Sequence, residues 1–200
     1  MKKKRLIPFN LLPAAWGLTG KSRKIAEAEY YYDGYDLEVE LALIEHGDSA
    51  EYNKALIAID LKHNRIDQLE ADRKLAKLKH PEGSVELEVA LLEVSLKHEM
   101  ISQIDYDKKR ADLLEEPFMA MPKISWDPID PSKTYFELDY NEHFVRYLEQ
   151  NGYVGTEEEI INRWLNDVCL SVLDEVAPTD TEFVRTVRTV RRTDGKTEHS

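Results

Sequence analysis

The sequence repeats itself at an interval of 35 residues, and this repeat constrains the fold more than any other feature. Residues 61–74 (LKHNRIDQLEADRK) align with residues 96–109 (LKHEMISQIDYDKK). A period of this length is typical of folds that stack small supersecondary units on one another. Each unit predicts a helix, a tight turn and a second helix. We therefore expect a mainly α-helical fold built from tandem helical hairpins of about 35 residues.

The turn of each unit carries an apolar residue followed by a residue that can cap the next helix. Ile66 precedes Asp67 in the first unit, and Ile101 precedes Ser102 in the second. Aspartate and serine side chains accept hydrogen bonds from the free amides at the start of a helix. The spacing therefore predicts a helix that begins directly after each of these two caps.

Residues 101–114 (ISQIDYDKKRADLL) resemble the short C-terminal (SHOCT) helical module, with its serine, its acidic and aromatic residues, its basic pair and its Leu-Leu end. The glycine usual in that family's turn is replaced by Asn64 and Glu99, and asparagine tolerates a left-handed backbone better than glutamate does. The resemblance implies a hairpin for oligomerisation or docking rather than an active site. The candidate interface residues of the two hairpins are Ile66, Leu69, Ile101, Ile104 and Tyr106.

Composition divides the chain into five segments. Residues 1–20 predict an extended arm that is basic and apolar, and residues 21–116 predict the helical hairpin repeat domain. Four prolines between residues 117 and 131 predict a linker over residues 117–134. Residues 135–177 predict a small C-terminal helical unit, and residues 178–200 form a basic tail.

Two helices are expected in the C-terminal helical unit. Asp139 could cap the first, and residues 156–159 (TEEE) form a capping box that opens the second. Cys169 lies on the apolar side of the second helix, which predicts a buried structural thiol. Since it is the only cysteine, an internal disulfide and a cysteine-built zinc site are excluded, and a reducing cytoplasm is expected.

Charge is distributed in blocks along the chain. The first 24 residues carry seven basic residues and no acidic one, and residues 183–200 carry five basic and two acidic residues. Because the whole chain has a formal net charge of -12, residues 25–182 hold a net charge of -22. Such an acidic body repels nucleic acid, whose backbone is a polyanion, whereas the basic ends could contact an anionic partner. The candidate contacts are Lys2, Lys3, Lys4, Arg5, Arg185, Arg188, Arg191 and Arg192.

The two ends of the chain each admit two interpretations. The apolar arm can be a strap over the helical body, or an anchor that inserts Phe9 and Trp16 into a partner. The tail repeats Val-Arg-Thr, which predicts either an edge strand or an arm that orders on an acidic surface.

Catalytic and membrane motifs give only weak signals. Residues 15–22 (AWGLTGKS) satisfy a loose phosphate-loop pattern. Asp60, which follows an apolar run, could supply the carboxylate that holds magnesium in such a site. Prolines, however, interrupt the strand that must precede the loop. The histidines recur near expected helix ends without the spacing of a zinc site. We expect no catalytic residue, metal or cofactor. Neither a membrane span nor a secretory signal is expected, because no apolar run is long enough.

Taken whole, the chain resembles small tailed-bacteriophage proteins that have no assigned function. The resemblance lies in residues 16–21 (WGLTGK), in the two Leu-Lys-His units and in residues 136–139 (FELD). The helical repeat and the aromatic arm lead us to expect a non-enzymatic assembly or virion protein in the host cytoplasm or the virion, which docks on itself or on other phage proteins. One alternative is an acidic regulator that binds a basic surface of a host nucleic-acid enzyme. A second is a nucleotide-binding protein of the phosphate-loop type.

Overall fold

The computed structural model describes residues 3–126, 134–176, 189–191 and 197–199, and it divides the chain into two units. The first unit is Met1–Val94 and the second is Ser95–Ser200. Helices account for most of the described residues, so the prediction of a mainly α-helical fold is confirmed. None of the helices in the described ranges is long and apolar enough to cross a membrane.

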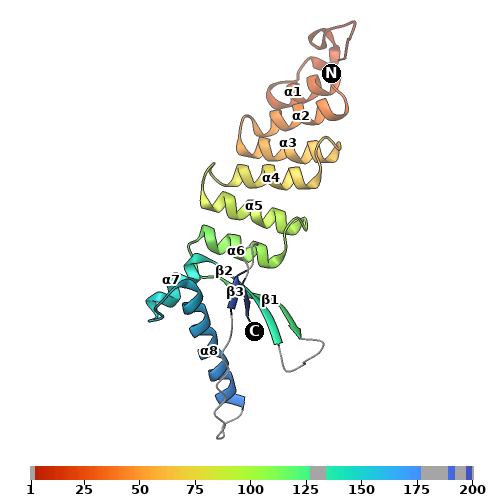
Figure 1. The fold of residues 1–200 in the computed structure, drawn as a ribbon. Helices are drawn as coiled ribbons and strands as arrows, with labels where there is room; N and C mark the ends of the chain where they lie inside the picture. Colours follow the sequence, from red (N-terminus) through yellow and green to blue (C-terminus); the bar gives the residue numbers. More distant parts are fainter. Residues whose placement is uncertain (1–2, 127–133, 177–188, 192–196, 200) are drawn as a thin grey trace. The chain divides into compact units, whose positions relative to one another are not determined.

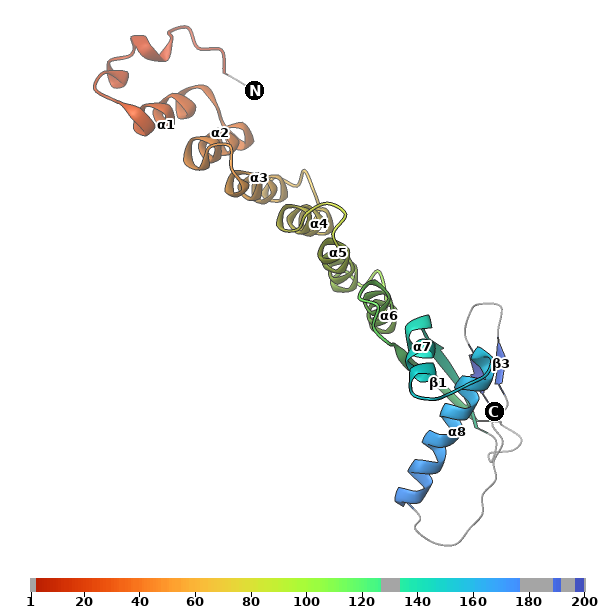
Figure 2. The ribbon, with the colours of Figure 1, turned by 90° about the vertical axis from the view of Figure 1, so that its left-hand side faces the viewer.

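The first unit is a row of helices in which each lies beside its neighbours along the chain (Figures 1 and 2). Two short 3-10 helices, η1 (Phe9–Leu11) and η2 (Pro13–Ala15), precede it. The row then contains α1 (Gly20–Tyr31), α2 (Gly34–His46), α3 (Ala50–Lys62), α4 (Gln68–Lys79) and α5 (Val85–Lys97), of which the last crosses the division between the units. Figure 2 views several of these helices end-on and shows a stack one helix thick.

Small side chains fill much of the space between the stacked helices. The buried apolar residues of α1 to α5 are Ala28, Ala42, Ile57, Ala71, Ala76 and Leu87. Alanine allows two helix backbones to approach closely, but it contributes little buried apolar area. Since none of the described residues forms a second layer over this row, most of its larger apolar side chains are only half-buried.

The turns of the two predicted hairpins have equivalent geometry. Asn64 and Glu99 both adopt a left-handed backbone, with φ of 52° and 55°. The amide of Asn64 donates to the carbonyl of Leu61 at 3.0 Å, and the amide of Glu99 donates to that of Leu96 at 2.9 Å. Such a left-handed residue typically ends a helix and satisfies its last free carbonyl groups.

The two expected helix caps are also present. The side chain of Asp67 accepts from the Glu70 amide at 2.7 Å, and that of Ser102 accepts from the Asp105 amide at 3.1 Å. They open α4 and α6 (Gln103–Leu113) respectively. The sequence repeat therefore corresponds to a repeat of local backbone structure.

The second unit combines helices with an antiparallel sheet. After α6 come β1 (Met119–Trp126), β2 (Thr134–Tyr140), α7 (Glu142–Gln150), α8 (Glu157–Val176), β3 (Thr189–Arg191) and β4 (Thr197–His199). The strands lie in the order β1-β2-β4-β3. The core of the unit lies among β2, α7 and α8, and its buried members are Leu138, Phe144, Leu148, Ile160, Ile161 and Leu165.

The linker predicted over residues 117–134 is wrong for its central part, because Met119–Trp126 form strand β1. Pro122 is accommodated at a bulge, where the pairing of β1 with β2 shifts between Ala120 and Lys123. An edge strand can contain a proline at such a bulge, because the missing amide is not needed by a second neighbour.

The C-terminal unit predicted over residues 135–177 also begins differently, because it opens with a strand rather than a helix. Thr134–Tyr140 contain aromatic and β-branched residues and pair with β1 as strand β2. Asp139 therefore lies in a strand, and Asn141 caps α7 in its place. The capping box at the start of α8 is present, since Thr156 and Glu159 each accept a hydrogen bond from the other's amide.

The basic tail predicted over residues 178–200 is described only in part. Residues 189–191, which include Arg191, form β3 at an edge of the sheet, in agreement with the edge-strand interpretation. Arg185, Arg188 and Arg192 lie outside the described residues, as does Lys2 of the arm.

Candidate interaction surfaces

The arm before α1 packs against the surface of α1, as the strap interpretation predicts. Phe9 is buried, its ring centroid lies 5.8 Å from that of Tyr30, and its amide donates to the Tyr31 hydroxyl at 3.0 Å. The Tyr30 hydroxyl donates to the carbonyl of Ile7 at 2.8 Å. The interpretation of Phe9 as an anchor for a partner is therefore wrong, because its side chain is already enclosed by the protein's own residues.

Two of the basic residues proposed for an anionic partner instead fasten the arm. Lys3 forms an ion pair with Asp33. The guanidinium of Arg5 lies 4.9 Å from the centre of the Tyr30 ring, and its Nε donates to the Tyr30 carbonyl at 3.1 Å. Lys4 is exposed. Arg5 is also exposed despite these contacts, whereas Lys3 is half-buried.

Several apolar side chains of the arm remain exposed. Trp16 keeps 71% of its surface exposed, as the anchor interpretation requires. Three aliphatic residues of the same segment are also exposed, and together with Trp16 they form what we term the arm patch: Leu6, Ile7, Leu11 and Trp16. Neighbouring exposed apolar side chains are typical of an interaction surface.

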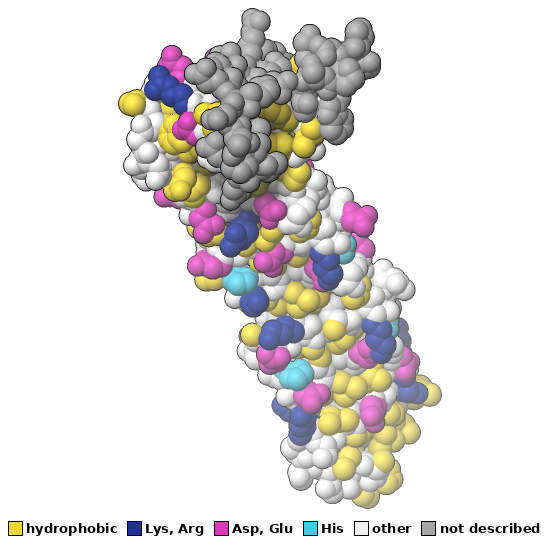
Figure 3. Space-filling model, turned by 90° about the horizontal axis from the view of Figure 1, so that it is seen from below, with side chains coloured by type: hydrophobic (Ala, Val, Ile, Leu, Met, Phe, Trp, Pro, Cys, Tyr) yellow, Lys and Arg dark blue, Asp and Glu magenta, His cyan; other side chains and the backbone are white. Residues whose placement is uncertain are grey.

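The interface residues proposed for the hairpins are all half-buried. Ile66 and Leu69 flank the turn between α3 and α4, and the other three, Ile101, Ile104 and Tyr106, lie at the turn before α6 or within that helix. The protein's own residues therefore cover a large part of each of these side chains. On the face that Figure 3 shows, hydrophobic side chains lie between charged ones along the helices.

A cluster of polar and aromatic residues joins α2 to the end of α3. The Tyr35 hydroxyl donates to Asp60 at 2.8 Å, and the Arg65 guanidinium lies 3.8 Å from the centre of the Tyr35 ring. The ring of His63 meets that of Tyr35 edge-on at 5.4 Å. Asp60, which the sequence offered as a magnesium ligand, is thus engaged by Tyr35. Sequence reasoning missed this cluster, because nothing in the local pattern pairs Tyr35 with a residue 25 positions away.

Glu38 extends the same cluster. Its carboxylate accepts from Lys62 Nζ at 2.7 Å and lies 3.3 Å from His63 Nε2. The hydrogen bond from Lys62 holds the pKa of Glu38 below its ordinary value. These contacts tie neighbouring helices of the stack together, and His63 lies at the carboxyl end of α3, where a histidine was expected.

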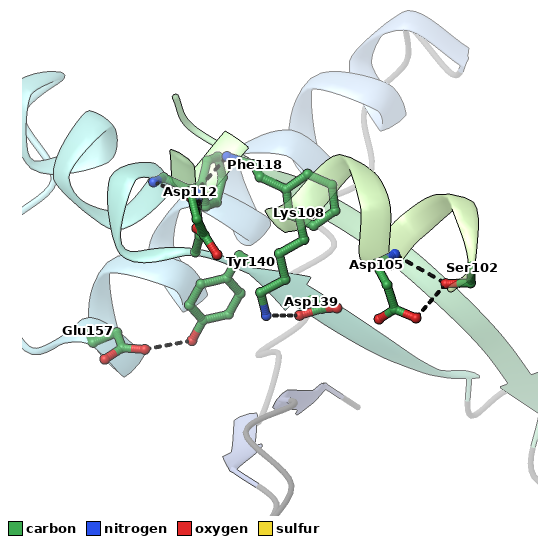
Figure 4. Close-up of polar contacts among 10 residues, drawn as sticks. Ser102, Asp105, Lys108, Asp112, Phe118, Asp139, Tyr140 and Glu157 are labelled. Carbon is green, nitrogen blue, oxygen red and sulfur yellow. Dashed lines mark hydrogen bonds and ion pairs between the residues drawn. The ribbon is translucent and has the colours of Figure 1, made fainter. Parts of the chain in front are cut away.

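A second polar cluster lies in the second unit, where α6 meets β2 and α7 (Figure 4). Asp139 is buried and pairs with Lys108 Nζ at 2.5 Å. Asn141 accepts hydrogen bonds from the amides of Phe118 and Phe144, each at 3.0 Å, and its own amide group donates to Asp112 at 2.8 Å. A buried carboxylate and a buried amide are thereby both satisfied, which indicates a structural junction.

An open polar groove of about 670 Å³ lies beside this junction. Its walls carry charges of both signs, among them Lys108, Glu142, Arg146 and Glu157. The Glu157 carboxylate accepts from the Tyr140 hydroxyl at 3.1 Å, as Figure 4 shows. The groove therefore has neither the apolar walls nor the single charge sign that are typical of a small-molecule site.

The carboxyl-terminal half of α8 carries a second exposed apolar surface. Ile161 and Leu165 are buried, but the same face of the helix continues through Val168 and Val172, which are 39% and 52% exposed. Cys169, beside them, is exposed, so the expectation of a buried thiol is wrong. The reason is that the core covers only the first half of the helix. We term Val168, Cys169 and Val172 the α8 stripe.

The phosphate-loop pattern lies in a different structural context from the one that its chemistry requires. The 3-10 helix η2 precedes it, and the described residues of the first unit contain no strand. In the described part of the chain, no three His, Cys, Asp or Glu side chains are grouped so that they could hold a metal ion. Comparisons with protein families, curated proteins and solved structures find no match to this chain.

Proposed function

We propose that this protein is a non-enzymatic interaction protein that assembles with copies of itself. The observation that carries the proposal is the exposure of apolar side chains on two separate surfaces, the arm patch and the α8 stripe. Exposed apolar surface is costly in water and is typically retained where another molecule covers it. Both surfaces lie on segments that the protein holds in place. Tyr30 and Tyr31 bind the arm that carries the arm patch. The core of the second unit holds the first half of α8, the helix that carries the α8 stripe.

The helix stack supports the same proposal. Stacks of helical hairpins offer long surfaces whose side chains are only partly covered, and such surfaces are typical of proteins that bind other proteins. The SHOCT-like hairpin and the resemblance to phage proteins suggest the context: assembly of a tailed-bacteriophage particle, in the host cytoplasm or in the virion. Nucleic acid is not an expected partner of residues 25–182, because their net charge is strongly negative.

Light scattering coupled to size exclusion, over a range of protein concentrations, tests the proposal. We expect the full chain to form an oligomer that grows with concentration, and Trp16→Ser to shift it towards the monomer. Val154→Ser is the matched control, because Val154 has the same exposed fraction as Trp16, 71%, and lies outside both surfaces. A chain that remains monomeric at every concentration would contradict self-assembly.

A further inference from the structure

The inference concerns which surfaces of two copies meet, and it rests on the proposed self-assembly. The arm patch belongs to the most basic stretch of the sequence. Lys4, Lys21, Arg23 and Lys24 are all exposed, and the first 24 residues include no acidic side chain. A partner for this surface must therefore offer apolar side chains together with negative charge.

The α8 stripe has these two properties. Helix α8 contains six acidic residues and one basic residue, and its last turn has no basic residue to offset the negative end of the helix dipole. Val168 and Val172 continue the face that Ile161 and Leu165 bury in the core. The stripe is thus an extension of a core-forming face that the described residues leave uncovered.

Charge also decides against pairing like surfaces. Two arm patches brought together would place basic residues against basic residues, and two α8 stripes would place acidic residues together. Two copies of a chain with a net charge of -12 repel each other in general, and the basic first 24 residues are a segment that counters this repulsion.

We propose that the arm patch of one copy docks on the α8 stripe of a second copy. This contact joins two different surfaces, so after it forms one copy retains a free stripe and the other retains a free patch. Repetition of such a contact generates a ring or an open chain rather than a closed dimer. Salt should weaken the association, because charge attraction contributes to it.

A mixing experiment on full-length chains tests the head-to-tail contact. One variant, Leu11→Ser with Trp16→Ser, removes the arm patch, and another, Val168→Ser with Val172→Ser, removes the stripe. All four positions are exposed, so both variants are expected to keep the circular dichroism of the unchanged chain. We expect each variant alone to be monomeric, and an equal mixture to form dimers and nothing larger, because each mixed pair has one intact contact.

Other results overturn the inference in distinguishable ways. If the mixture stays monomeric, or if one variant alone still assembles as the unchanged chain does, the two surfaces do not meet, although self-assembly itself stands. If the unchanged chain is monomeric at every concentration, both the inference and the proposed function fail. If the arm variant assembles normally but loses binding to vesicles of anionic lipid, the arm patch serves a membrane surface instead.

Cys169 provides an independent measurement in the unchanged sequence, because it lies in the stripe and is the chain's only cysteine. Its alkylation by iodoacetamide should slow several-fold when the protein concentration is raised into the range where oligomers form. The arm variant should show no such protection, and Val154→Ser should show it in full. Equal alkylation rates for assembled and monomeric protein would place the contact elsewhere.

Discussion

Glu99 holds a left-handed backbone conformation, with φ of 55°, at the turn after α5. This conformation costs a residue with a β-carbon about 1–2 kcal/mol, and glycine does not have this steric cost. Glycine gives back part of the advantage, because its greater conformational freedom stabilises the unfolded chain. We therefore expect Glu99→Gly to raise the free energy of unfolding by about 0.5–1 kcal/mol. Urea denaturation followed by circular dichroism measures it.

Asn64, at the equivalent position of the first hairpin, is the control for this prediction. Its φ is 52°, but asparagine tolerates the left-handed region better than glutamate does. Asn64→Gly should therefore stabilise the protein less than Glu99→Gly does. If the two changes had equal effects, or if Glu99→Gly destabilised the protein, backbone strain at Glu99 would be contradicted.

Glu38 gives the helix stack a pH-dependent contact. The hydrogen bond from Lys62 is the largest cause of its lowered pKa, and His63 contributes in the same direction. Because its pKa is lower in the folded chain, the carboxylate stabilises the protein above its unfolded-state pKa, and this stabilisation is lost as the pH falls through the folded pKa. Glu38→Gln should lower the urea midpoint slightly at pH 7. At about pH 2 it should leave the midpoint unchanged, because the protonated Glu38 carboxyl is then as uncharged as the glutamine side chain.

The exposed residue Glu45, on the same helix, supplies the comparison for Glu38. Glu45→Gln should have a smaller effect on the urea midpoint at pH 7. The urea midpoints of the unchanged chain and of Glu38→Gln should converge in acid. If their difference stayed the same at about pH 2, the contact would act through packing rather than through charge.

At the scale of elements, Asn141 connects more of them than any other residue described above. Its side chain accepts from Phe118 before β1 and from Phe144 in α7, and it donates to Asp112 in α6 and to the carbonyl of Glu116. Asn141→Ala removes the cap of α7 and leaves buried polar groups without partners. We expect a loss of about 2–4 kcal/mol in the free energy of unfolding, measured by urea denaturation.

Asn151→Ala is the control for that change, because Asn151 is exposed and its side chain makes one hydrogen bond, to the carbonyl of Tyr147. Its cost should be below about 1 kcal/mol. Similar losses for the two changes would mean that the junction around Asn141 adds nothing beyond an ordinary helix-end contact.

The elements that the sequence predicted well are those whose boundaries depend on local interactions. The caps at Asp67 and Ser102 and the box from Thr156 to Glu159 are visible in the sequence because each bonds within three residues. Strand β1 depends instead on pairing with β2 across a bulge at Pro122, which no local pattern reveals. Choosing Asn141 over Asp139 as a cap likewise requires knowing that Asp139 pairs with Lys108, 31 residues away.

The candidate surfaces were predictable to a similar degree. The apolar and basic arm is evident from composition, and Trp16 is exposed as the anchor interpretation requires. Which aromatic residue would be enclosed was not evident, because Phe9 is covered by Tyr30 and Tyr31 of a later helix. The amphipathic pattern of α8 was clear too, but periodicity alone could not show that the core ends near Leu165 and leaves Cys169 exposed.

At the scale of the whole molecule, the two units are stabilised in different ways. In the second unit, side chains from β2, α7 and α8 meet in one core, whereas in the stack each helix lies beside its neighbours along the chain. Stability in such a stack is close to a sum of neighbour contacts, so a change in one helix acts locally. A single core, in contrast, opens as one cooperative unit.

Amide hydrogen exchange can detect this difference. Ile161, which has 0% of its surface exposed, lies in the core of the second unit, and Ile161→Ala should cost about 2–5 kcal/mol. We expect faster exchange throughout β2, α7 and α8, with no change in α2 and α3. Ile57→Ala, at the buried position of α3, should speed exchange in α2, α3 and α4 only. If either change accelerated exchange equally in every helix, the stack and the core of the second unit would open together, and the chain would behave as one cooperative unit.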